Sequence, residues 1–196
     1  MATSFIKKFN QFIEDMISMF ENLFSNKEEP KVLTIKNLET GCIFEYDLRT
    51  WKVEETYEYD WGDHFFTREY KISDGSETAF LHVEDDDELE LLFSKPVSIR
   101  KIDKDLGNYI SNNQETPDEL SLDGKKYYLD GEHPGYFRNL DKEEHWTEFI
   151  SWDYYDEEEK SNLCVEQWGE KSFEASQGHV IKEYQISNIL PKPEKN

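Results

Sequence analysis

The chain has 196 residues, enough for one sizeable domain or two small ones that share a core. Only 36% of the residues are hydrophobic but 15% are aromatic, which favours β structure and argues against disorder. With 44 acidic and 22 basic residues, the net charge of −22 disfavours binding to nucleic acids and to anionic membrane surfaces, while it would attract cations or polyamines.

The first expected element is an amphipathic helix over residues 4–25, where apolar residues recur at steps of three and four. Glu14 and Asp15 interrupt the apolar run well short of the ~20 residues of a transmembrane helix, and we expect no signal peptide. The apolar face needs a cover, which could be the chain's own β domain, a partner protein or a membrane interface. This interaction face comprises Phe5, Phe9, Phe12, Ile13, Met16, Ile17, Phe20, Leu23 and Phe24.

The β part is expected to follow a polar linker that ends at Pro30, so that residues 1–30 form one segment and residues 31–191 a β domain. Short alternating runs of apolar and polar residues, broken by turns such as Asp74-Gly75 and Asp123-Gly124, predict antiparallel strands. We divide this domain into a first unit (31–102), a connector (103–119) and a second unit (120–191), with a tail at 192–196. Expected strands include 68–72, 79–83, 89–93, 97–102, 125–129, 147–155, 162–168, 171–175 and 180–186.

The second unit resembles the first in sequence. Leu81-His82-Val83-Glu84 recurs as Leu163-Cys164-Val165-Glu166, and Thr67–Tyr70 has a weaker counterpart in Trp146–Phe149. The predicted fold is therefore all-β, with two tandem similar antiparallel β-meander units that form a barrel or a sandwich, preceded by an N-terminal amphipathic helix.

No residue pattern predicts catalysis, a cofactor or a metal site. The acidic run Glu84–Glu88 lacks the glycine of a calcium loop, and its residues point in different directions from a strand end, which indicates a solvated turn. The five histidines have no metal-binding spacing, and Cys42 and Cys164 are far apart without a zinc or redox motif, which fits a reducing compartment. A dyad of Cys164 with a histidine remains a minor alternative.

Glu84 and Glu166 occupy matching positions of the two units and could face each other. Alternatively, each lies on the solvent face of its strand, opposite Val83 and Val165. Rings such as Trp61 and Trp168 could line a ligand groove with the two glutamates, although such rings more often pack in cores. These four residues, Glu84, Glu166, Trp61 and Trp168, form the candidate ligand cleft.

Several stretches resemble a bacterial family catalogued as a domain of unknown function, number 4178. They are Leu38–Gly41, Trp51–Val53, Tyr59–Trp61, Phe80–Glu84, Leu163–Glu166 and Ile189–Pro191. The resemblance extends from about Ile35 to Pro191 and brings no catalytic motif. It implies an association with membrane-linked systems, including stress-response and polyamine-related ones.

We therefore expect a non-catalytic adaptor in the cytoplasm, peripheral at the inner membrane face, that contacts a membrane or a partner protein through residues 4–25. Nucleic acid is not an expected partner, and self-association stays open. The alternative function is a domain that binds a small molecule, a cation or a polyamine in an acidic cleft, with an enzymatic activity left open.

Overall fold

The computed structural model describes residues 32–142 and 145–193. The fold belongs to Leu33–Asn196, one of the two units into which the chain divides. The predicted amphipathic helix at 4–25 lies outside the described residues. Among the residues that are described, no helix has the length and apolar character needed to cross a membrane.

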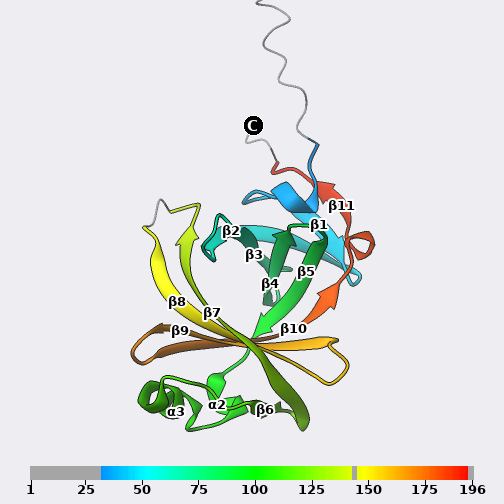
Figure 1. The fold of residues 1–196 in the computed structure, drawn as a ribbon. Coiled ribbons are helices and arrows are strands. Elements are labelled where there is room, and N and C mark those ends of the chain that lie inside the picture. Colours follow the sequence, from blue (N-terminus) through cyan, green and yellow to red (C-terminus); the bar gives the residue numbers. More distant parts are fainter. Residues whose placement is uncertain (1–31, 143–144, 194–196) are drawn as a thin grey trace, which may run out of the picture. The chain divides into compact units, whose positions relative to one another are not determined.

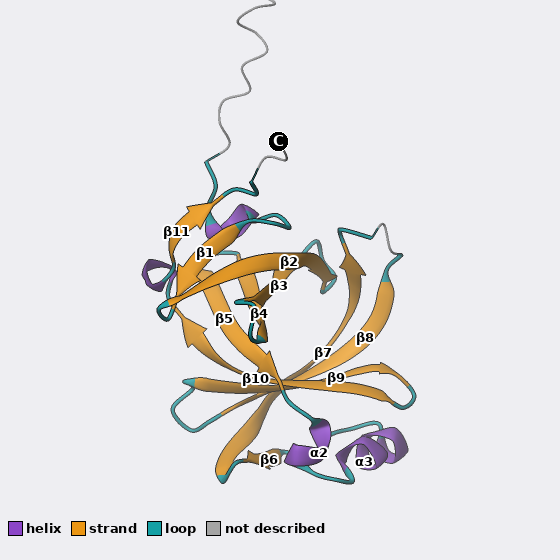
Figure 2. Cartoon of the chain, turned by 180° about the vertical axis from the view of Figure 1, so that it is seen from behind, coloured by secondary structure: helices purple, strands orange, loops and turns teal. Residues whose placement is uncertain are grey.

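The domain is built almost entirely of antiparallel strands, which confirms the predicted all-β class (Figure 1, Figure 2). Four short helical segments accompany them, η1 (Ile35–Asn37), α2 (Ile99–Ile102), α3 (Leu106–Asn113) and η2 (Glu183–Gln185). The strands are β1 (Ile43–Tyr46), β2 (Arg49–Asp60), β3 (Phe66–Ser73), β4 (Thr78–Asp85), β5 (Leu89–Pro96), β6 (Glu119–Leu122), β7 (Lys125–Asn139), β8 (Thr147–Tyr155), β9 (Ser161–Gly169), β10 (Ser172–Ile181) and β11 (Ser187–Leu190).

Hydrogen bonds join all these strands into one sheet in the order β11-β1-β2-β3-β4-β5-β10-β9-β8-β7-β6. An additional pairing between β2 and β7, from Tyr57 opposite Asn139 to Asp60 opposite Tyr136, closes part of the sheet on itself. The closed part, here called the β ring, consists of β2, β3, β4, β5, β10, β9, β8 and β7. A closed eight-stranded sheet is wide enough to be filled by side chains or to hold one small ligand.

Two hydrophobic cores stabilise the domain. The first gathers residues of β1 to β5 with η1 and β11, and includes the fully buried Trp51 and Leu81. The second gathers residues of β6 to β10 with α2 and α3, and includes Trp152 and Leu163. Because side chains alternate along a strand, each core is formed by the side chains on one face of its strands, and the side chains on the other face point away from that core.

The predicted hairpin turns at Asp74-Gly75 and Asp123-Gly124 are present, between β3 and β4 and between β6 and β7. Asp123 and Gly124 have φ angles of 51° and 80°, the left-handed pair that a tight two-residue hairpin requires. Glu157–Lys160 forms the exposed hairpin tip that was expected between β8 and β9.

Two sequence-based expectations were wrong. Residues 99–102 form helix α2 and not the end of a strand. The connector, for which the sequence predicted no helix or strand, contains helix α3. Ile99, Ile102, Leu106 and Ile110 follow a helical spacing and pack on the second core, so tertiary burial selects the helical state. Residues 171–175 and 180–186 are not separate strands, because continuous pairing with β5 and β9 keeps β10 extended over Ser172–Ile181, and Glu183–Gln185 form η2.

Candidate functional site

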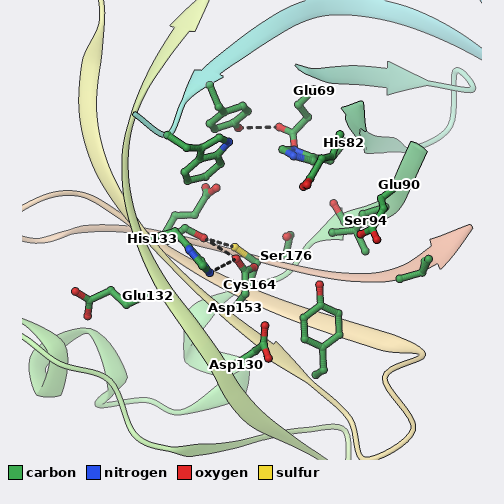
Figure 3. A pocket seen from close by; sticks show the side chains of 18 of the residues that line it. Glu69, His82, Glu90, Ser94, Asp130, Glu132, His133, Asp153, Cys164 and Ser176 are labelled. Atoms are coloured by element: carbon green, nitrogen blue, oxygen red, sulfur yellow. Dashed lines mark hydrogen bonds and ion pairs between the residues drawn. The ribbon is translucent and has the colours of Figure 1, made fainter. Parts of the chain in front are cut away.

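A cavity of about 520 Å³ lies on the face of the β ring opposite the two cores (Figure 3). Each strand of the β ring contributes at least one lining residue. The alternation of β4 illustrates why, since Leu81 and Val83 are buried in the first core whereas His82 and Glu84 line the cavity. In β9, Leu163 and Val165 belong to the second core, and Cys164 and Glu166 face the cavity.

The cavity is strongly acidic. Two histidines, His82 and His133, are its only side chains of basic type, and neither lysine nor arginine occurs among the described residues that line it. The carboxyl groups that face the cavity are those of Glu69, Glu84, Glu90, Asp130, Asp153 and Glu166, whereas the Glu132 carboxylate points away from it and accepts the indole N–H of Trp152 at 2.8 Å (Figure 3). Such a concentration of one charge sign in a concave site focuses a negative potential on the enclosed space.

On the side formed by the first half of the chain, Glu69 of β3 is held by its neighbours. The Tyr59 hydroxyl donates a hydrogen bond to Glu69 Oε1 at 3.0 Å, and His82 Nδ1 lies 3.7 Å from Glu69 Oε2. Beside Tyr59, the stacked ring of Trp61 lies 5.6 Å away between centroids and donates its indole N–H to Thr67. Glu69 is thus presented to the cavity next to an aromatic wall.

On the side formed by the second half of the chain, Asp153 of β8 lies near a histidine, as Glu69 does on the first side. The Ser151 hydroxyl lies 3.5 Å from Asp153 Oδ2 and 3.3 Å from the Cys164 sulfur, and His133 Nε2 is 3.9 Å from Asp153. Burial, and then the charges of Asp153 and Glu166, raise the pKa of the Cys164 thiol well above its usual value. The thiol is therefore protonated and a poor nucleophile, which argues against the Cys164–histidine dyad.

The hairpins β3–β4 and β8–β9 place an acid and a tyrosine at similar register positions. Tyr70 pairs with Leu81 and Tyr154 pairs with Leu163, each directly after an acidic residue, Glu69 or Asp153. The loops of the two hairpins differ in length, so this correspondence is not visible at a constant spacing in the sequence.

Acidic residues stand opposite each other across two strand pairs. Glu84 pairs with Glu90 between β4 and β5, and Glu166 pairs with Glu174 between β9 and β10. Burial and the Glu90 carboxylate raise the pKa of Glu84. Burial, with the carboxylates of Glu69, Glu174 and Asp153, raises the pKa of Glu166 to about 8. Glu166 therefore carries a proton at neutral pH.

Trp168 contacts Glu166 on the side away from the cavity and does not line the cavity itself. Its indole N–H donates to Glu166 Oε2 at 3.3 Å, and its ring stacks on Phe149 with centroids 4.7 Å apart. The ring of Phe149 also lies 5.5 Å from that of Trp61 between centroids, which links the residue that follows β2 with the aromatic residues of β8 and β9. This aromatic cluster fixes the wall from which Glu166 reaches the cavity.

The structure therefore brings Glu84, Glu166 and Trp61 of the candidate cleft to one cavity, while Trp168 contacts Glu166 without lining it. Val83 and Val165 are buried on the opposite face, as the strand alternation requires. The predicted helix face of residues 4–25 lies outside the described residues. Sequence reasoning missed Glu69, Glu90, Asp130, His133 and Asp153. Their alternation with core residues indicates that they lie on the face of the strand away from the core. It does not show whether that face borders a cavity or bulk solvent.

The acidic run Glu84–Glu88 does not gather around one point. Glu84 faces the cavity, whereas Asp85 forms an exposed ion pair with Lys36. Within residues 32–142 and 145–193, no cluster of three or more His, Cys, Asp or Glu side chains has the arrangement of a metal site. Among the other histidines, His179 forms a hydrogen bond of 2.8 Å between its Nε2 and the Tyr46 hydroxyl. It does not belong to a cluster of metal-ligating side chains among the described residues.

A family model described as a domain of unknown function (DUF4178) matches residues 39–183. An uncharacterized protein of Aquifex aeolicus (strain VF5) is 27% identical over 184 residues, which cover 90% of this chain and 98% of that protein. No solved structure matches the chain.

Proposed function

The chain belongs to the DUF4178 family, and we propose that it is a binding domain for small organic polycations of the polyamine class, held in the acidic cavity. The observation that carries this proposal is the set of carboxyl groups that line the cavity without a lysine or arginine among its described lining residues. Carboxylates collected at one concave site repel one another unless a cation accompanies them.

The distribution of the acids favours a ligand with several separated charges. In Figure 3, Glu69 and His82 lie at the top of the view, Glu90 at the right and Asp130 at the bottom. A dehydrated metal ion needs carboxylate oxygens that converge on one point. An extended polyamine can instead place one ammonium group near each acidic side.

The size and the rings of the cavity fit the same ligand class. A volume of about 520 Å³ lies within the range of sites for small organic molecules and far exceeds the volume of a bare ion. Tyr59, Trp61 and Tyr155 add aromatic surface, on which ammonium groups and the methylene segments between them can pack.

Titration calorimetry and thermal unfolding with spermidine at low ionic strength test the proposal. We expect saturable one-site binding and an increase in stability of about 2.7 kcal/mol when free spermidine is about 100-fold above the Kd. Magnesium at equal ionic strength and an uncharged diol of similar length serve as ligand controls, and both are expected to bind much more weakly.

Matched variants locate the site. Glu69→Gln together with Asp153→Asn removes two cavity charges and is expected to weaken spermidine binding at least tenfold, on the order of 1.4 kcal/mol. Glu157→Gln together with Glu159→Gln removes two charges from the exposed hairpin tip and should change little. Equal losses in both double variants, or equal responses to spermidine and magnesium, would sink the proposal.

We also propose that the cavity arises from two copies of one five-stranded unit, β1–β5 and β6–β10. In support, His82 and Cys164 hold the same register position relative to Glu69 and Asp153. The cross-strand pairs Glu84–Glu90 and Glu166–Glu174 also correspond. The pairings β2–β7 and β5–β10 then join the polar faces of the two copies around one space.

A separate proposal concerns residues 4–25, which would attach this binding domain to a membrane face or to a partner protein. The amphipathic sequence pattern supports it. Together the two proposals describe an adaptor that responds to polyamines and is held at a second component by its N-terminal segment.

A further inference from the structure

Glu166 has acidic neighbours on two strands and little that compensates its charge. On β10 the residue directly opposite is Glu174, and on β8 the neighbouring Asp153 also faces the cavity. Among the described side chains, the one hydrogen-bond donor to its carboxyl group is the uncharged indole of Trp168. Like charges placed opposite each other on a sheet are destabilising, so this geometry favours a neutral carboxylic acid.

Other titratable groups around the cavity do not change this balance. Glu69 of β3 adds a further negative charge near Glu166, and the Tyr59 hydroxyl of β2 donates to Glu69. The histidines are placed next to other acids, His82 beside Glu69 and His133 beside Asp153. The remaining acids that face the cavity, Glu84 on β4, Glu90 on β5 and Asp130 on β7, increase the negative potential.

We propose that Glu166 holds a proton in the empty cavity and releases it when a polyamine binds, so that the site exchanges a proton for an ammonium group. This inference rests on the proposed function. In the exchange, the O–H bond of the carboxylic acid breaks, the proton passes to the buffer, and the carboxylate formed pairs with the incoming ammonium. Binding then strengthens as the pH rises, until Glu166 is ionised without the ligand.

The first test is calorimetry of spermidine binding at pH 7 in two buffers with different ionisation enthalpies. For the wild-type chain we expect the apparent enthalpy to depend on the buffer, with release of nearly one proton per bound ligand. Between pH 6 and pH 7.5, the affinity should rise by up to about tenfold per pH unit, the limit for release of one proton.

The variant Glu166→Gln reproduces the shape of the protonated acid and cannot ionise. We expect it to bind spermidine with a smaller buffer dependence and a flatter pH profile, because the proton of Glu166 is no longer there to be released. Glu157→Gln, at the exposed hairpin tip, removes a carboxyl group elsewhere and should keep the wild-type proton release.

A ligand-free measurement completes the test. The side-chain carboxyl ¹³C resonance of Glu166, assigned by its loss in Glu166→Gln, should titrate near neutral or alkaline pH and move to lower pH with spermidine. Spermidine binding without proton release, or a Glu166 resonance that is already ionised at pH 6, would overturn the inference alone. Failure of spermidine to bind at any pH would overturn the proposed function with it. If Glu166→Gln does not fold, Glu174→Gln replaces it: removal of the carboxylate opposite Glu166 lowers the pKa of Glu166 and should reduce the proton release at pH 7, and an unchanged release would overturn the inference.

Discussion

The stability of the domain should depend on pH through Glu166, and Glu166→Gln should remove that dependence. Burial and the neighbouring acids raise the pKa of this carboxyl from 4.5 to about 8 in the folded chain. As the pH rises above 4.5, the unfolded chain loses a proton that the folded chain keeps, so the free energy of unfolding falls until about pH 8. The contribution is therefore present at low pH and lost at high pH.

The size of the effect follows from the same values. Each unit of difference between the pKa values of the folded and unfolded chain changes the free energy of unfolding by about 1.4 kcal/mol. The difference between 4.5 and about 8 therefore corresponds to roughly 5 kcal/mol as an upper limit. Glu166 is only partly buried, and solvent in the cavity screens its charge, so we expect roughly 2 to 3 kcal/mol. This is a large share of the roughly 5–15 kcal/mol that stabilises an ordinary domain.

Urea unfolding at pH 5, 7 and 9, in the absence of polyamine, measures the contribution of Glu166 to the free energy of unfolding. The difference in unfolding free energy between Glu166→Gln and the wild type should be near zero at pH 5 and should favour the variant by roughly 2 to 3 kcal/mol at pH 9. Glu157→Gln corrects for the general effect of removing one negative charge. A difference for Glu166→Gln that stays constant across this pH range would refute the reasoning.

Three further predictions concern other parts of the chain. In thermal unfolding, Gly178→Ala should lower the unfolding free energy by about 1–3 kcal/mol, because an added Cβ would lie 2.9 Å from the Phe93 carbonyl oxygen. Gly169→Ala serves as the control and should be nearly neutral, because its added Cβ would meet open space. Cys164 should react with Ellman's reagent at pH 8 far more slowly in the folded chain than in urea, since partial burial and the neighbouring acids raise the pKa of its thiol; equal rates would contradict the protonated state. In liposome flotation, the full chain should float and a version that begins at Pro30 should not; flotation of neither would exclude a membrane anchor and leave a protein partner as the target of residues 4–25.

The amino-acid sequence alone was enough to predict the all-β class and several local features of the site. Alternation in Leu81–Glu84 and Leu163–Glu166 correctly assigns one face of each strand to a core, because side chains on a strand point to opposite faces in turn. The turns at Asp74-Gly75 and Asp123-Gly124 were also predictable, since their conformations depend on residues close in the chain.

Only the tertiary structure decided where the polar faces lie. Alternation separates two faces of a strand, but it does not say whether the polar one meets bulk solvent or an enclosed space. That depends on the long-range pairings β2–β7 and β5–β10, which join residues about 80 positions apart and carry no local signal. Pairing with β5 and β9 made β10 one continuous strand, and burial against the second core made residues 99–102 helical. The acidic cavity therefore follows from how the two halves of the sheet close on each other, because closure partly shields Glu166 from water and places it among other acids.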